Sequence, residues 1–150
     1  MAGVVLGTEG YEVSSQNGRY RIIPHAGKVI LEDGVQLEAN TAVSKGLFPS
    51  RNTILSEEVT VDNLVHIAHG VQIGKRTKVA AQAMIAGSVT IGENVWIGPG
   101  VSISSEVTIG DQAAITIGSV VTKDVLPGKR VSGNFAIDHQ KFLSFLRSIR

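Results

Sequence analysis

His69 is the residue of this sequence best suited to acid–base chemistry, because a carboxylate and a glycine stand at related positions around it. Asp62 lies seven residues before His69, and Gly87 lies eighteen residues after it. A carboxylate near an imidazole holds its tautomer and raises its basicity, so that the imidazole takes a proton from a nucleophile. A glycine amide can donate to the negative oxygen that nucleophilic attack creates. Taken singly, each residue also has a structural explanation: a solvated histidine, or a glycine that a tight turn requires.

The elements that position these residues repeat every six residues. Aliphatic side chains recur at this period from Leu31 to Val121, interrupted once between Val43 and Leu55, and a small or β-branched residue follows most of them by four positions. Neither a helix nor an alternating strand keeps a period of six. The pattern is typical of a parallel β-solenoid in which three hexads close a triangular coil. We therefore predict an all-β fold in which Gly87 lies one coil above His69, at the same corner.

Two segments interrupt the solenoid pattern. Alternating apolar residues on either side of Asn17-Gly18 predict a protruding β-hairpin near residues 10–24. Pro49 falls at an inward position where the ladder needs an N–H, which predicts a loop near residues 46–53.

The C-terminal part of the sequence predicts a different element. Leu126-Pro127-Gly128 ends the repeats, and Asp138 is placed to cap a short amphipathic helix over residues 138–150. The expected organisation is a β-helix domain over residues 1–137 followed by this helix. Its apolar face is expected to pack on the prism, on a neighbouring subunit or on a carrier protein.

Composition excludes several classes of function. The formal net charge of +1 gives no basic field for nucleic acid. The absence of cysteine excludes disulfides, thiolate nucleophiles and zinc–thiolate sites. The sequence shows neither a secretory signal nor a run of the ~20 apolar residues that a membrane span needs. We expect a cytoplasmic protein.

The segment from Asp62 to Gly74, followed by Ile85-Ala86-Gly87-Ser88, resembles the signature of the UDP-3-O-acylglucosamine N-acyltransferases of lipid A (lipopolysaccharide) synthesis. The similarity covers most of the chain. It extends back to the segments 6–11, 27–31 and 38–41, whereas residues 118–128 and 131–136 resemble the C-terminal signature of hexapeptide-repeat acyltransferases at large. The resemblance implies a left-handed β-helix, a homotrimer, and an active site in the cleft between two subunits.

The resemblance also implies roles for individual residues. His69 would be the general base that deprotonates the acceptor amine, Asp62 would orient His69, and the amide of Gly87 would stabilise the oxyanion formed at the thioester carbon. The expected substrate-binding residues are Asn63, His66, Ser105 and Glu106.

The sequence departs from that family at two places. The lipid A enzymes carry an N-terminal uridine-binding domain before the helix, whereas this chain starts at the helix itself. They also carry a second active-site histidine about two coils above the first, where this chain reads Ser104-Ser105-Glu106. Either Glu106 takes that role or the role is absent. An amino sugar other than the lipid A precursor, with or without a linked nucleotide, therefore fits better as the acceptor.

The expected acyl donor is a thioester, acyl-CoA or acyl-carrier protein, with no covalently bound cofactor. Two basic clusters are placed to bind the CoA phosphates or an acidic carrier, or else form a solvated rim. One is Lys75, Arg76 and Lys78, and the other, which we favour, is Lys123, Lys129 and Arg130.

The sequence therefore predicts an N-acyltransferase acting on an amino sugar. A sugar O-acetyltransferase is one alternative, because the same base serves a hydroxyl, and a non-catalytic β-helix scaffold is another. The γ-carbonic anhydrases share the architecture but need a His-x4-His pair and a distant third histidine. His66 and His69 are three apart, and no other histidine lies in the regular coils. We expect no metal site.

Overall fold

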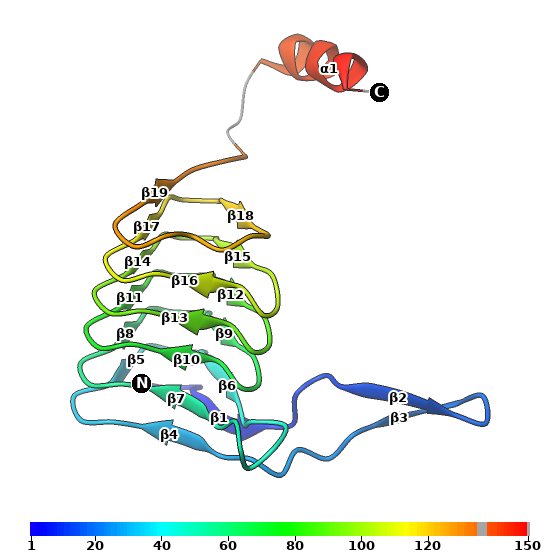
Figure 1. Cartoon of the computed structure of the whole chain (residues 1–150), viewed down its shortest axis with the longest axis vertical. Coiled ribbons are helices and arrows are strands. Elements are labelled where there is room, and N and C mark those ends of the chain that lie inside the picture. The colour runs from blue at the N-terminus through cyan, green and yellow to red at the C-terminus, as the bar shows by residue number, and fades with distance from the viewer. Residues whose placement is uncertain (135–137, 150) are drawn as a thin grey trace.

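The structure is a computed structural model that describes residues 1–134 and 138–149. These residues form a parallel β-helix, a hairpin that projects from its first coil, and one C-terminal helix (Figure 1). The fold class predicted from the hexads is confirmed. In the regular coils each strand pairs with the strand eighteen residues further along the chain, so that Ile67 pairs with Ile85 and Ile85 with Ile103.

Three parallel sheets form the sides of the prism. The first sheet contains β1 (Val5–Thr8), β6 (Ala42–Ser44), β9 (His66–Ile67), β12 (Met84–Ile85), β15 (Ser102–Ile103) and β18 (Val120–Val121). The second sheet contains β4 (Val29–Leu31), β7 (Thr53–Leu55), β10 (Gln72–Ile73), β13 (Thr90–Ile91) and β16 (Thr108–Ile109). The third sheet contains β5 (Gln36–Leu37), β8 (Thr60–Val61), β11 (Lys78–Val79), β14 (Trp96–Ile97), β17 (Ala114–Ile115) and β19 (Arg130–Val131).

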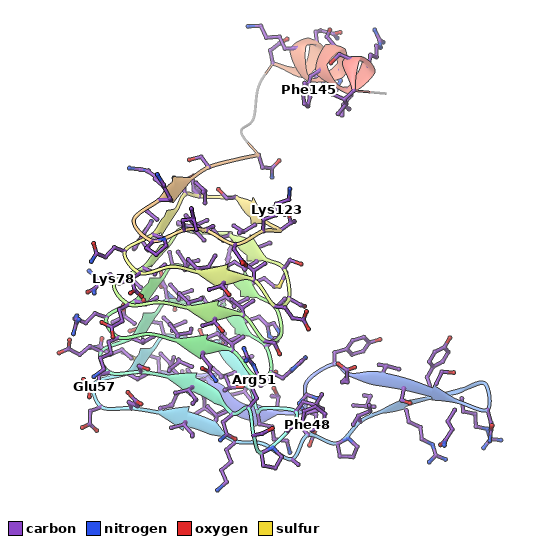
Figure 2. All side chains as sticks on the ribbon, viewed as in Figure 1. Phe48, Arg51, Glu57, Lys78, Lys123 and Phe145 are labelled. Carbon is purple, nitrogen blue, oxygen red and sulfur yellow. The ribbon has the colours of Figure 1, made fainter. Side chains whose placement is uncertain are left out.

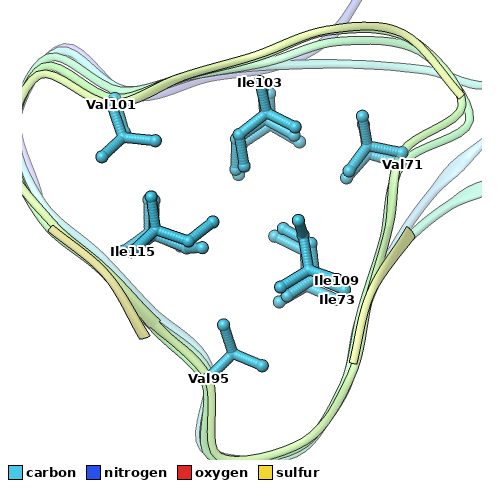
Figure 3. Packing of buried hydrophobic residues seen from close by; sticks show 14 of the residues in the cluster. Val71, Ile73, Val95, Val101, Ile103, Ile109 and Ile115 are labelled. Carbon is cyan, nitrogen blue, oxygen red and sulfur yellow. The ribbon is translucent and has the colours of Figure 1, made fainter. Parts of the chain in front are cut away.

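The core consists of columns of aliphatic side chains stacked along the axis of the prism (Figure 3). Isoleucine supplies the inward position of most strands, and valine or alanine fills the second inward position beside each turn. Ile67, Ile85 and Ile103 are each fully buried and lie in one such column. Where threonine takes the second position, its hydroxyl bonds to the backbone: Thr53 Oγ1 donates to Ser44 O and accepts from Gly70 N–H.

Each corner of the prism contains a residue with left-handed backbone dihedrals. These residues also recur every six positions, and those of the middle coils are Glu58, Leu64, Gly70, Arg76, Gln82, Ser88, Asn94, Gly100 and Glu106. Glycine adopts this conformation freely, but Leu64 has a φ of 60° and Ser88 also has a φ of 60°. The hydrogen-bonded ladders on both sides of each corner hold these residues in the unfavourable region.

Both predicted interruptions of the solenoid are present. The hairpin pairs β2 (Val13–Gln16) with β3 (Arg19–Ile22) in antiparallel register, and its turn residues Asn17 and Gly18 have φ values of 53° and 71°. The segment around Pro49 leaves the ladder and returns to it at Thr53, the first residue of β7.

The C-terminal end of the β-helix differs in one respect from the sequence prediction. The repeats do not end at Leu126-Pro127-Gly128, because β19 follows that turn and pairs with β17 in the third sheet. Helix α1 (His139–Ser148) begins as predicted, since Asp138 Oδ1 accepts from the N–H groups of Gln140 and Lys141. The expected domain boundary falls beside residues 135–137, which lie outside the described residues. The helix stands clear of the prism in Figure 1.

The packed columns predict a large cost for a cavity in the middle of the prism. Replacing the fully buried Ile97 by alanine should lower the free energy of unfolding by about 2–5 kcal/mol. Thr108→Ala, at an exposed outward position, should change it by less than about 0.5 kcal/mol. Denaturant titration followed by circular dichroism measures both. Equal effects of the two variants would contradict the inward assignment.

Candidate active site

One corner of the prism brings His69, Gly87 and Ser105 together in successive coils. Each follows, by two residues, one member of the column Ile67, Ile85 and Ile103, which pair with one another directly. Backbone hydrogen bonds connect the turns, from Ser88 N–H to His69 O (2.9 Å) and from Glu106 N–H to Gly87 O (3.0 Å). The predicted stacking of Gly87 over His69 is therefore confirmed. This corner lies between the first and second sheets.

The His69 ring lies directly against Gly87. A methyl group built on Gly87 would lie 2.6 Å from both Cε1 and Nε2 of His69, so any larger residue must displace the ring. In the part of the chain that the structure describes, the Gly87 N–H has no protein acceptor. Other turns also leave this amide free, but here it lies beside an imidazole. The pair offers a proton acceptor and a hydrogen-bond donor to the same small volume.

A second histidine, His25, contacts the His69 ring. The ring centroids lie 5.3 Å apart and the ring planes are nearly perpendicular, at 89°. His25 comes from the segment after the hairpin and is only 5% exposed. Its Nδ1 lies 3.1 Å from Lys45 O and 3.3 Å from Gly10 N. No pattern in the sequence indicates a role for His25, because it lies outside the regular coils.

The surroundings of His69 favour its neutral form. Burial lowers the pKa of the His69 imidazole below its ordinary value, and the nearby His25 lowers this pKa further. Glu12 acts in the opposite direction and raises it. Since burial is the largest of these effects, the ring is neutral at physiological pH and its free nitrogen can accept a proton.

Arg51, labelled in Figure 2, connects the two turns of this corner by hydrogen bonds, and no pattern in the sequence indicates this role. Its Nε donates to Gly70 O (3.1 Å), and its Nη2 donates to Ser88 O (2.8 Å) and to Thr90 Oγ1 (3.3 Å). Gly70 and Ser88 directly follow His69 and Gly87 in the chain. The loop over residues 46–53 therefore holds the corner through Arg51.

The structure places Asp62 away from His69 within one chain. Asp62 follows β8, whereas His69 follows β9, so the two residues lie at opposite ends of the first-sheet strand β9. Asp62 Oδ1 accepts from Asn63 N–H (2.7 Å) and from Asn63 Nδ2 (2.6 Å). Asn63 Oδ1 in turn accepts from Ala39 N–H at 3.2 Å. Inside one protomer, therefore, Asp62 stabilises its own turn.

Asp62 also lines a groove on the third sheet with a volume of about 200 Å³. Lys78 and Trp96 line the same groove, and the Trp96 side chain is 44% exposed. An exposed indole beside a carboxylate and an ammonium group is suited to contact a partner.

The expected substrate-binding residues occupy three places. Ser105 lies above Gly87, and Glu106 lines a shallow cavity of about 430 Å³ with Arg51, Thr90 and Thr108. His66 points outward from β9, in register with Ala42 and Met84. Asn63 lies beside Asp62. One chain thus brings Ser105 and Glu106 to the His69 corner, but not Asn63.

The two basic clusters differ in their surroundings. Lys123 lines a pocket of about 240 Å³ at the last coil, near Asp124, whereas Lys129 and Arg130 are not part of its lining. The cluster of Lys75, Arg76 and Lys78 is paired with acidic residues. Lys75 Nζ lies 3.0 Å from Glu57 Oε2, which raises the pKa of Lys75. The ion pair between Arg76 and Glu93 is longer, at 3.5 Å.

The fold and the repeat define a class of protein, that of the hexapeptide-repeat proteins. The profile of the family "Bacterial transferase hexapeptide (six repeats)" matches residues 52–87 and 88–123. These segments contain the regular coils, with His69 in the first match and Ser105 in the second. The chain therefore belongs to the hexapeptide-repeat transferase family.

Two curated relatives with similar sequences are both named UDP-3-O-acylglucosamine N-acyltransferase. The protein from Methylobacterium nodulans is 38% identical over 131 residues, which covers 87% of this chain and 37% of the relative. The protein from Methylacidiphilum infernorum is 44% identical over 80 residues, which covers 53% of this chain and 22% of the relative. The chain thus spans only about a fifth to somewhat over a third of the length of these relatives.

Solved structures show the same fold. LpxA from Acinetobacter baumannii aligns over 97% of this chain and 55% of its own, with a TM-score of 0.76 and 19% identity. The acetyltransferase domain of PglB from Neisseria gonorrhoeae, in complex with acetyl coenzyme A, aligns over 73% of this chain and 53% of its own, with a TM-score of 0.54 and 20% identity. Among the described residues, no helix is long and apolar enough to cross a membrane.

The contact between His69 and Gly87 predicts the effect of a single methyl group. Gly87→Ala should displace the His69 ring while the β-helix stays folded, because the added carbon meets the ring and not the backbone. The ¹H–¹³C NMR signals of the His69 ring should shift, whereas Gly133→Ala, with open space around it, should leave them in place. Unchanged His69 signals in Gly87→Ala would show that the two residues do not touch.

Proposed function

We propose that this chain is an N-acyltransferase that moves an acyl group from a thioester to the amine of a nucleotide-linked amino sugar, with His69 as the general base. The observation that carries the proposal is the contact between the neutral His69 imidazole and Gly87, whose amide is free. The names of the curated relatives support the choice of an amino-sugar acceptor.

The reaction assigns one step to each group. His69 takes a proton from the acceptor amine while the amine nitrogen attacks the thioester carbon and a C–N bond forms. The Gly87 N–H donates to the carbonyl oxygen, which becomes negative in the tetrahedral intermediate. The C–S bond then breaks, and the imidazolium returns its proton to the leaving thiolate. The low pKa of His69 keeps the ring ready for the first step.

The proposed donor is acyl-CoA, or acyl-carrier protein. The PglB domain, which shares the fold, holds acetyl coenzyme A, and a thioester of this kind supplies a thiol leaving group. The pocket at the last coil presents Lys123 for a phosphate group. Lys129 and Arg130 follow on the next turn and strand, and we propose that they add to the same positive surface.

We further propose that the working unit is a homotrimer with the site between two subunits. The outward residues of the two sheets beside the His69 corner contain no acidic or permanently cationic side chain in the middle coils. In the first sheet they are Ala42, His66, Met84, Ser102 and Val120, and in the second sheet Ile54, Gln72, Thr90 and Thr108. Faces depleted of charge are typical of the buried centre of an interface.

Assembly would also give Asp62 a role in catalysis. Within one chain the carboxylate lies beside Trp96 in the third-sheet groove, away from His69. In a closed trimer, that groove would face the His69 corner of a neighbour. Asp62 and Asn63 of one subunit would then complete the site of the next.

Removing the imidazole tests the proposed base. His69→Ala should lower kcat by ~10²–10⁴-fold, because no other group takes the proton from the amine. Thiol release from acyl-CoA or acyl-carrier protein, measured against a panel of UDP-linked amino sugars, gives the rate, and mass spectrometry separates an amide product from an ester. His139→Ala, in the exposed C-terminal helix, is the matched control. Normal turnover by His69→Ala would remove this residue from the mechanism.

Mixed oligomers test whether the site is shared. Asp62→Asn and His69→Ala chains, carrying different tags and expressed together, should regain activity in mixed trimers, because about a quarter of random subunit pairs combine both intact residues. A mixture of His69→Ala with Gly87→Ala should gain nothing, since both changes affect the same corner of one chain. Light scattering should give three times the chain mass of 15.8 kDa. A monomer, or no recovery in the first mixture, would overturn the shared site.

A further inference from the structure

His25 is the most deeply buried histidine of the chain, and one of its ring nitrogens has no partner in the described structure. The residue is 5% exposed, and its Nε2 is fully buried with no hydrogen-bond partner among the described residues. A buried nitrogen without a partner carries a free-energy cost, because it has lost its hydrogen bonds to water. A phenylalanine or leucine would fill the same space without that cost. The cost therefore calls for a functional explanation.

The hydrogen bonds of His25 fix its ring from several directions. Nδ1 lies near one acceptor, Lys45 O (3.1 Å), and near one donor, Gly10 N–H (3.3 Å), and serves only one of them at a time. Glu9 Oε2 accepts from the backbone N–H of His25 at 2.7 Å, while Glu9 Oε1 pairs with Lys45 Nζ at 2.7 Å. Backbone groups of Gly10 and Lys45 thus hold the ring, and Glu9, paired with Lys45, holds the His25 backbone; these contacts together form a clamp.

The clamped ring is placed to act on His69. It meets the His69 ring edge to face at 5.3 Å, and Lys45, to which it bonds, lies one coil below His69, because Val43 pairs with Ile67. Gly87 lies one coil above. The His69 ring is therefore bounded by a glycine and by a rigidly held imidazole, a geometry that restricts its rotation.

We propose that His25 is a positioning residue that fixes the orientation of the His69 ring against Gly87. The proposal rests on the proposed role of His69 as general base and adds a second residue to that site. A base that is held in one rotamer reaches the amine proton without reorganisation, and a displacement of about 1 Å costs up to about 10²-fold in rate. Because Glu9 and Lys45 hold His25, the position of the N-terminal segment determines where the His25 ring lies beside His69.

His25 also acts on the protonation of His69. The charge interaction with His25 lowers the pKa of His69, in addition to the larger effect of burial. Glu12 opposes it, and the Glu9–Lys45 pair and the Arg51 guanidinium are the other charged groups nearby. Loss of His25 should therefore raise the pKa of His69. As the pH falls, the active neutral form of His69 is then lost at a higher pH than in the wild type.

The test compares His25→Ala with His25→Phe in the full chain. His25→Ala should lower kcat by about 10–100-fold with little change in KM, and should move the acid limb of the pH–rate profile to higher pH. His25→Phe keeps an aromatic ring beside His69 and should recover part of the lost kcat. His139→Ala serves as the control for removal of a histidine. Folding is checked by amide NMR spectra.

A readout that needs no turnover separates this proposal from the proposed function. The NMR titration of the His69 ring should move to higher pH in His25→Ala, whether or not an acyl acceptor has been found. If His25→Ala does not fold, Glu9→Gln loosens the same clamp and should shift the NMR signals of the His69 ring and lower kcat, with Glu57→Gln as its matched control. A His69 titration and a kcat that stay at wild-type values in these folded variants would overturn the proposal. Normal turnover by His69→Ala would overturn only the general-base mechanism, whereas an unchanged His69 titration in His25→Ala would overturn the positioning role of His25.

Discussion

The eighteen-residue register of the parallel ladders is the constraint on which the rest of the structure depends. Backbone hydrogen bonds connect the strands and turns of each coil to the coils above and below, so the position of a corner residue depends mainly on the residues one coil away. The isoleucine columns keep this register, because a shift by one residue would turn buried side chains outward. The contact between His69 and Gly87 follows directly from it.

The same register explains why the candidate site combines a rigid part with an irregular part. The regular coils supply His69, Gly87 and Ser105, whose backbone positions follow from the ladder. The irregular segments supply His25, Glu12 and Arg51, which surround the corner from the hairpin region and from the loop over residues 46–53. Interruptions of a repeat are places where side chains can be added without disturbing the core. In this chain both interruptions lie near one corner.

Almost all of the fold was predictable from the sequence, because each hexad contains its own buried apolar residue. The same local signal therefore recurs many times along the chain. The hairpin, the loop at Pro49 and the Asp138 cap were predictable for the same reason, since each depends on a few adjacent residues. The site was predictable only where the repeat itself determines the distance, as for His69 and Gly87. His25 and Arg51 reach the corner through a chain path with no period, so no spacing in the sequence indicates them.

Asp62 illustrates a different limit of the sequence. Its place in the motif predicted a partner for His69, but a strand of the first sheet separates the two residues within one chain. A motif records residues that act together, and it does not record whether they act within one molecule or across an interface. Within a single chain, the Asp62 carboxylate accepts hydrogen bonds from Asn63 and not from His69.

The left-handed residue at every corner has a consequence for how such a chain can change in length. An insertion of one or two residues in a corner moves every later left-handed position onto a residue that must be inward or extended, and the damage runs to the end of the prism. Lengthening is therefore confined to whole coils, or to excursions that leave and rejoin the wall at the same point, as the hairpin does. In such a molecule, new segments are added as excursions from the wall, and the β-helix itself lengthens only by whole coils.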